Sequence, residues 1–110
     1  MSTLPPGLEK LVFEFRGSMS AGHFDPILVG VVGSGNLEVL FEPTPGSSCR
    51  FHVETSARGF RSIWEAVFRD FHRRNPYAGL QVSINDMGAT PAVVGLRLQQ
   101  AAAELPKGHS

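Results

Sequence analysis

An aromatic stripe in the second half of the chain is the feature that most constrains the fold. Six apolar side chains recur at helical spacing between residues 60 and 71: Phe60, Ile63, Trp64, Val67, Phe68 and Phe71. Charged residues lie off this stripe: Arg61, Glu65, Arg69 and Arg73. An amphipathic helix must bury its apolar face against another element. The stripe therefore predicts a helix that covers a sheet, with the aromatic side chains in the core, and Asn75-Pro76 ends that helix.

Two segments on either side of this helix alternate between apolar and polar residues. In residues 50–55, one face takes Phe51, Val53 and Thr55, and the other takes Arg50, His52 and Glu54. Residues 80–85 repeat the pattern, with Leu80, Val82 and Ile84 on one face. Such alternation predicts strands of a sheet that has one face in water. We also expect a first strand over residues 11–15, a flexible loop over residues 17–25 and a turn over residues 43–48.

A second helix is predicted from residue 91 to about residue 104. Thr90 is a good N-cap, and proline suits the first helical position, which Pro91 would occupy. The expected buried side consists of Val94, Leu98, Ala101 and Ala102. The fold class is therefore α+β, a small, mainly antiparallel sheet with two helices packed on one face. We expect one domain over residues 1–110, with flexible ends at residues 1–10 and 105–110.

Composition excludes several classes of function. The 110 residues carry a formal net charge of zero, which argues against a nucleic-acid partner held by phosphate neutralisation. His72, Arg73 and Arg74 form a small basic cluster, interpreted as a solvated helix end. The single cysteine, Cys49, cannot form an internal disulfide and is predicted to be structural. No leader and no membrane-length apolar run is visible, so we predict a soluble, cytoplasmic protein without a membrane partner.

A predicted β-hairpin carries an exposed serine at its tip. Residues 27–32 and 37–42 are strand-like, and residues 33–36 have turn chemistry, so Ser34 would lie at the tip between Gly33 and Gly35. Glycine, serine and asparagine are typical of ordinary turns, and this inert interpretation is favoured by spacing alone. The stretch does not match the G-x-S-x-G nucleophile elbow, the dinucleotide fingerprint or the P-loop. Sequence pattern alone gives an exposed serine on a hairpin tip.

The other titratable residues do not assemble into a catalytic or metal site. The four histidines, His23, His52, His72 and His109, show no metal-ligand spacing. His52 and Glu54 would share a strand face and could coordinate or titrate together, although an exposed face is the stronger interpretation. Asp86 is expected to bond turn amides near the bend at residues 88–90. We therefore predict no catalytic residue and no metal.

Two blocks of sequence resemble a known family. The stretch V-G-S-G-N-L-E-V-L at residues 32–40 is similar to the prosthetic-group segment of the delta subunit of malonate decarboxylase, the acyl carrier protein of that enzyme. The stretch D-M-G-A-T-P-A-V-V at residues 86–94, followed by L-R-L at residues 96–98, also matches. The resemblance covers residues 11–104. One departure is Asn36, where the family more often has aspartate.

The resemblance implies a carrier role with a covalent group. Ser34 would hold 2'-(5''-phosphoribosyl)-3'-dephospho-CoA through a phosphodiester, and the thiol of that group would carry acetyl and malonyl as thioesters. Gly33, Gly35 and Asn36 would form the supporting turn. The implied partners are a prosthetic-group transferase, a malonyl transacylase, and the acyl-carrier transferase and decarboxylase subunits. Familiar phosphopantetheine carriers are helical bundles with the serine at a helix start, whereas this chain would present Ser34 from a β-turn.

Three alternatives stay open at this point. A citrate lyase-type acyl carrier is related in role, although the G-A-T-P stretch at residues 88–91 and the chain length favour the malonate enzyme. A non-catalytic interaction module would leave the hairpin tip unmodified. A small hydrolase would use Ser34 with a histidine such as His52, but no oxyanion or base arrangement is readable in the sequence.

Overall fold

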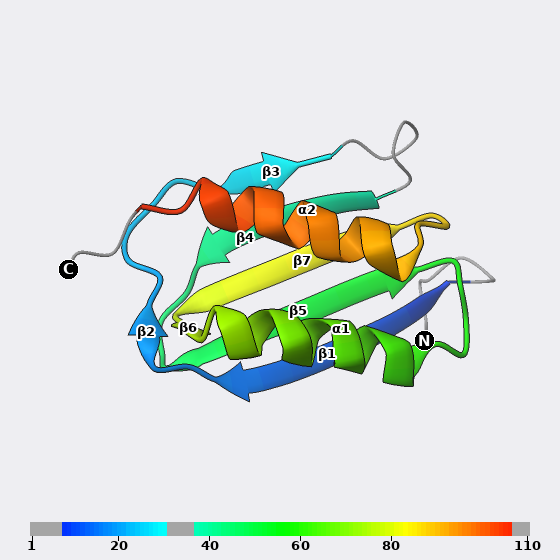
Figure 1. Ribbon diagram of the computed structural model, residues 1–110, viewed down its shortest axis with the longest axis horizontal. Helices are drawn as coiled ribbons and strands as arrows, with labels where there is room; N and C mark the ends of the chain where they lie inside the picture. Colours follow the sequence, from blue (N-terminus) through cyan, green and yellow to red (C-terminus); the bar gives the residue numbers. More distant parts are fainter. Residues whose placement is uncertain (1–7, 31–36, 107–110) are drawn as a thin grey trace, which may run out of the picture.

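Two helices lie on the same face of a five-stranded sheet (Figure 1). The computed structural model describes residues 8–30 and 37–106. The elements follow along the chain as β1 (Glu9–Arg16), β2 (Met19–Ser20), β3 (Ile27–Val29), β4 (Leu37–Pro43), β5 (Ser48–Thr55), α1 (Arg61–Arg74), β6 (Tyr77–Ala78), β7 (Leu80–Asp86) and α2 (Pro91–Ala103). The strand order in the main sheet is β1-β5-β7-β4-β3. The predicted α+β class, with a mainly antiparallel sheet rather than a helical bundle, is confirmed.

One parallel pair lies at the centre of the sheet. β5 and β7 run in the same direction, with Phe51 opposite Val82, and α1 makes the crossover between them. The remaining neighbours, β1 with β5, β7 with β4 and β4 with β3, pair antiparallel. Both helices therefore cover the face to which the apolar residues of β5 and β7 point.

Aromatic side chains fill the space beneath α1. The rings of Phe51 and Phe68 stack with their centroids 4.2 Å apart, and Trp64 and Phe71 are also buried. The predicted stripe is thus core along most of its length. Its first turn departs from the prediction, because Phe60 is 46% exposed and Ile63 is 42% exposed. Phe60 is the N-cap residue, and this first turn faces a pocket instead of the sheet.

Aliphatic side chains attach α2 to the sheet. Val94, Leu98 and Ala101 are buried, and the predicted Ala102 is half-buried. Thr90 caps the helix as predicted, because its Oγ1 accepts a hydrogen bond of 3.4 Å from the backbone N–H of Val93. The predicted start of the helix at Pro91 is therefore confirmed, and it ends at Ala103, one residue before the predicted end.

A two-stranded parallel sheet closes one end of the molecule. β2 lies inside the segment predicted to be a flexible loop and pairs with β6. The N–H of Ala21 donates to the carbonyl of Ala78 at 3.0 Å, and Ala21 is buried. A Cβ atom at Gly17 would collide with the backbone carbonyl of Tyr77, so the approach of the two segments requires glycine there. The loop prediction was wrong only for the two residues of β2, whose pairing with β6 could not be predicted because both strands are short and distant in sequence.

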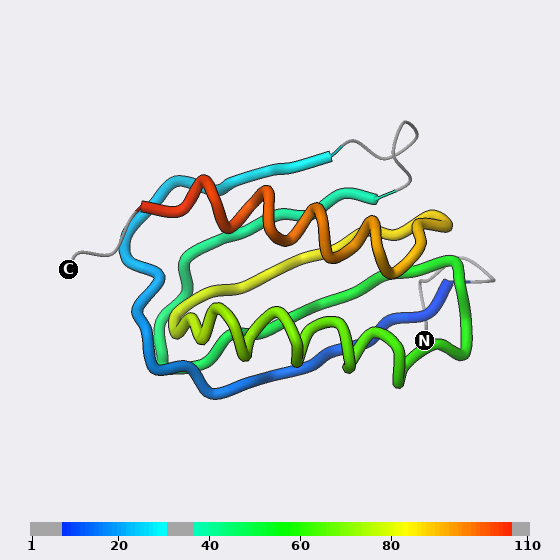
Figure 2. The backbone as a smooth tube through the Cα atoms, in the orientation of Figure 1, coloured from blue at the N-terminus to red at the C-terminus, as the bar shows by residue number. Residues whose placement is uncertain are grey.

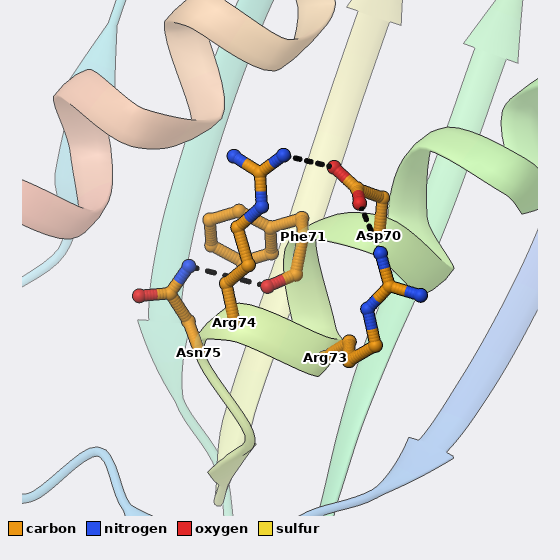
Figure 3. A network of polar contacts seen from close by, with 5 residues as sticks. All are labelled: Asp70, Phe71, Arg73, Arg74 and Asn75. Carbon is orange, nitrogen blue, oxygen red and sulfur yellow. Dashed lines mark hydrogen bonds and ion pairs between the residues drawn. The ribbon is translucent and has the colours of Figure 1, made fainter.

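The basic cluster at the end of α1 separates into a buried and an exposed part. His72 is only 7% exposed; its ring stacks on Phe15, and its Nε2 lies 3.1 Å from the carbonyl oxygen of Tyr77. The solvated interpretation was therefore wrong for His72. It is correct for Arg73 and Arg74, which are exposed and pair with Asp70 at 2.8 and 3.1 Å (Figure 3).

The described ends of the chain are tied to the main sheet. β1 begins at Glu9, inside the segment predicted to be a flexible arm, and Leu105 near the other end is 4% exposed. The Glu9 carboxylate accepts a hydrogen bond of 3.0 Å from the N–H of Gly59.

Within residues 8–30 and 37–106, neither helix is long and apolar enough to cross a membrane.

Candidate functional site at the base of the hairpin

The strands on either side of the serine segment form the predicted hairpin. Ile27 lies opposite Phe41, and Val29 lies opposite Val39, in an antiparallel pair at the edge of the sheet. The connection itself, residues 31–36, lies outside the described residues. The attachment residue Ser34 and the supporting turn of Gly33, Gly35 and Asn36 therefore stay predictions. What the structure describes is the base on which that connection stands.

Both helices begin at the end of the sheet where the chain leaves β3 and enters β4 (Figure 2). At this end Leu37 lies opposite Asp86 of β7, and Asp86 in turn lies opposite Thr55 of β5. A row of three paired residues thus runs from the hairpin into the centre of the sheet.

Asp86 organises this row through a buried carboxylate. It is 1% exposed, and its Oδ2 accepts a hydrogen bond of 2.6 Å from the hydroxyl of Thr55. Its Oδ1 accepts from the backbone N–H groups of Gly88 and Ala89 at 3.3 and 2.7 Å. The predicted bonding of turn amides by Asp86 is confirmed. Because both oxygens are engaged, this carboxylate braces the β7–α2 loop beside the hairpin.

Gly30 marks the close approach of three segments at the hairpin base. Its φ is +82°, a conformation that favours glycine. A Cβ atom at this position would collide with the backbone oxygen of Leu37 and would lie 3.0 Å from Nε of Arg97. The end of β3, the start of β4 and the side chain of Arg97 from α2 are therefore in contact range of one another.

Arg97 is the charged group that the sequence analysis did not single out. It is half-buried, and its Nε atom is buried without a hydrogen-bond partner among the described residues. Its Nη1 donates to Oε1 of Gln100 at 3.3 Å. The signal that could have identified it is composition, since Arg97 is the sole charged residue in the thirteen-residue α2.

An apolar pocket of about 270 Å³ opens between the first turns of the two helices. Its walls include Phe60, Ile63, Trp64, Val67, Ala89, Pro91 and Val94. The carboxyl group that contributes to the lining is Asp86, whose oxygens are already bonded. The pocket can therefore hold an apolar group, but the lining that the structure describes offers no free acid or base.

The described histidines lie away from the hairpin base. His52 is in the middle of β5, opposite Val12 and Ser83, with β7 and β4 between it and β3. His72 packs against β6 at the far end of α1, and His23 lies in the loop that precedes β3. Among the residues that the structure describes, no three His, Cys, Asp or Glu side chains come together to hold a metal ion. This arrangement gives no support to a hydrolase that pairs Ser34 with His52.

Cys49 lies in the core at the start of β5. It is fully buried, and burial raises the pKa of its thiol to about 12, because the thiolate would lose its hydration. The thiol is therefore neutral and unreactive in the folded chain, in agreement with the structural interpretation.

Comparisons with known proteins agree on one family. The model of the malonate decarboxylase delta subunit (MdcD) family matches residues 25–105. The malonate decarboxylase acyl carrier protein of Burkholderia cepacia is 69% identical over 101 residues, which cover 92% of this chain and 94% of the relative. That of Stenotrophomonas maltophilia (strain R551-3) is 48% identical over 104 residues, which cover 92% and 97%. Among solved structures, a chain of a Pseudomonas malonate decarboxylase hetero-tetramer in complex with malonate aligns with a TM-score of 0.78 and 40% identity, over 89% of this chain and 99% of that one.

Proposed function

The chain belongs to the malonate decarboxylase delta subunit family, and from this premise we propose that it is an acyl carrier subunit whose Ser34 holds 2'-(5''-phosphoribosyl)-3'-dephospho-CoA. The observation that carries the proposal is the hairpin base. The strands that flank Ser34 pair as an antiparallel hairpin at the edge of the sheet, so a modifying enzyme can approach from outside the core. Gly33, Gly35 and Asn36 would leave the serine hydroxyl uncrowded.

The structure at this end fits a group joined through a phosphate. A phosphodiester carries a negative charge, and the orphaned Nε of Arg97 is a buried donor beside the hairpin base. When bound, the group supplies a thiol on which acetyl and malonyl can be held as thioesters. The chain's own contribution is to hold this arm at the tip of a hairpin whose base is fastened by the Asp86 row.

The chemistry of decarboxylation would come from partner proteins. Among the residues that the structure describes, the carboxylates of Asp86 and Glu38 at the hairpin base both accept hydrogen bonds, and no three His, Cys, Asp or Glu side chains come together to hold a metal ion. We therefore assign catalysis to a malonyl transacylase, an acyl-carrier transferase and decarboxylase subunits, with a prosthetic-group transferase for loading. Tethering raises the effective concentration of the thioester at each partner. The structural relative is itself part of a hetero-tetramer, which is consistent with a multi-subunit assembly.

The decisive experiment is mass spectrometry of protein that has been co-expressed with the prosthetic-group transferase. We expect one adduct of the mass of the phosphoribosyl-dephospho-CoA group, and digestion should place it on Ser34. Ser34→Ala should remove the adduct completely and should melt at the same temperature as unloaded wild-type protein. Ser48→Ala, which changes a serine at the start of β5, is the matched control and should still be loaded.

Two results would contradict the proposal. An adduct on Ser48 or Ser56 would move the attachment site, and unmodified wild-type protein in an active complex would exclude a covalent carrier. When the arm carries acetyl, incubation of the complex with malonate should exchange it for malonyl and release acetate, and decarboxylation should then return acetyl to the arm with loss of CO2. Selective loading with a citryl group instead would favour the citrate lyase-type alternative.

A further inference from the structure

We propose that Arg97 binds the phosphodiester through which the prosthetic group is joined to Ser34. The inference rests on the proposed function and extends it to a residue of α2 that lies outside the glycine-flanked segment. It makes Arg97 a positioning residue for the arm, because a guanidinium bonded to the phosphate would hold the root of the arm against the edge of the sheet.

The first argument is position. Nε and Cδ of Arg97 would lie 3.0 and 3.3 Å from a Cβ atom at Gly30, so the guanidinium stem crosses the chain where β3 ends. On the other strand, Ser34 precedes Leu37 by three residues. Three residues of fully extended chain span at most about 11 Å. Covalent connectivity therefore limits the distance of the attachment point from the start of β4 to about 11 Å, and Arg97 of α2 contacts the neighbouring end of β3 at Gly30.

The second argument is an unfilled bonding capacity. A guanidinium has five N–H donors, and within the described residues Arg97 uses one of them, on Gln100 at 3.3 Å. Its buried Nε has no acceptor there. A buried donor without an acceptor is unfavourable, and an anionic oxygen is the acceptor that relieves it most strongly.

The third argument is charge. The exposed arginines Arg50, Arg69, Arg73 and Arg74 each pair with a carboxylate. Among the described residues, four arginines pair with no carboxylate: Arg16, Arg58, Arg61 and Arg97. Arg97 differs from the other three because it is half-buried and its helix contains no other charged residue. The planar fork of a guanidinium matches two oxygens of a phosphate, a geometry that a lysine does not provide. A cation in this place fits a phosphate joined to the neighbouring hairpin.

The direct test compares apo and loaded protein by NMR. In wild-type protein labelled with nitrogen-15, the Nε–H resonance of Arg97 should shift when the group is attached, whereas that of Arg69 should not. The phosphorus-31 resonance of the diester should differ between loaded wild type and loaded Arg97→Gln. These readouts need no enzyme activity, and the first one needs no variant.

A second measurement uses melting temperature. Loading should raise the melting temperature of wild-type protein by about 4 °C if the contact contributes to stability. This gain should vanish in Arg97→Gln and be reduced in Arg97→Lys, which keeps the charge but lacks the fork. Arg69→Gln, which removes an exposed arginine from α1, is the matched control and should keep the full gain.

The outcomes separate this inference from the proposed function. Ser34 could carry the group while loading shifts neither the Arg97 nor the Arg69 Nε–H resonance and raises the melting temperature of Arg97→Gln as much as that of Arg69→Gln. In that case the phosphate contact is overturned and the carrier function stands. If Ser34 carries no group, both are overturned. A shifted Arg97 resonance together with a lost gain in Arg97→Gln would establish the contact.

Discussion

The half of the molecule formed by β1, β5 and α1 is held together differently from the half formed by β3, β4 and α2. We call them the aromatic half and the aliphatic half. β1 pairs with β5 over eight residues, and the ring of Phe68 contacts those of both Phe13 and Phe51. β3 pairs with β4 over three residues, and α2 contributes aliphatic side chains such as Leu98. The contrast indicates that different parts of the fold provide its stability and present the arm. The aromatic half forms the scaffold, and the aliphatic half provides the sheet edge to which the arm is proposed to be attached.

The charges of the two helices follow the same division. On α1, Asp70 pairs with Arg73 and Arg74 (Figure 3). Glu65 pairs with Arg69 on the same helix, and all of these side chains are at least 43% exposed. Such exposed pairs contribute little to stability and leave these charges already partnered. On α2 the single charge is Arg97, which lies against Gly30. Arg97 is therefore the cation of the aliphatic half that is proposed to bind the phosphate.

The largest expected contrast is between two thiols. Cys49 is buried in the aromatic half with a thiol pKa raised to about 12, whereas the arm thiol is proposed to extend from the hairpin. Relative to a free cysteine, this pKa lowers the thiolate fraction at about pH 8 by roughly a thousandfold. Iodoacetamide should label the arm in native loaded protein, and Cys49 only after unfolding. Native labelling of unloaded protein at Cys49 would show that the scaffold opens locally.

The same shift gives a pH dependence of stability. The unfolded chain releases the thiol proton near the ordinary cysteine pKa of 9.0, whereas the folded chain keeps it until about pH 12. The folded state therefore binds more protons in this window, and the free energy of unfolding contributed by Cys49 should fall as pH rises from about 9 toward 12. Cys49→Ala should flatten this fall in denaturant titrations.

The next contrast is within α1 and concerns how far the scaffold extends. Phe68 is fully buried, so Phe68→Ala should lower the free energy of unfolding by about 3–5 kcal/mol. Phe60→Ala, the matched control at the start of the same helix, removes a side chain that is 46% exposed and should lower it by less than about 1 kcal/mol. Denaturant unfolding measures both. Equal losses would contradict the exposure of the first turn and extend the scaffold to the pocket.

The smallest expected effect concerns the row that links the two halves. Thr55→Val removes the hydroxyl that donates to Asp86 and accepts from the N–H of Ala57. The free energy of unfolding should fall by about 1–3 kcal/mol, because a buried carboxylate loses a donor. Ser83→Ala, on the open face of β7, should change it by less than about 0.5 kcal/mol. A neutral Thr55→Val would mean that the bond from Thr55 to Asp86 adds nothing to the connection that the sheet already makes between the two halves.

The sequence by itself determined the features that depend on neighbours along the chain. The period of the apolar residues placed α1 and predicted burial of Trp64 and Phe68, while Thr90 and Pro91 placed the start of α2. Two short motifs indicated the family, and Asp86 was assigned its bonds to turn amides because those amides follow it directly in sequence. These inferences succeeded because helix caps, alternation and turns are local properties of the backbone.

Only the tertiary structure decided what depends on segments that are distant in sequence. Periodicity extended the core to Phe60, but the first turn of α1 faces the pocket, so the side chain is exposed. Charge pattern assigned His72 to the surface, but the approach of Phe15 and Tyr77 buries it. Arg97 is separated from Gly30 by more than half of the chain, and no local pattern could bring them together. The sheet does so, because its order places β3 and β4 beneath α2, and packing across that distance is a property of the whole fold.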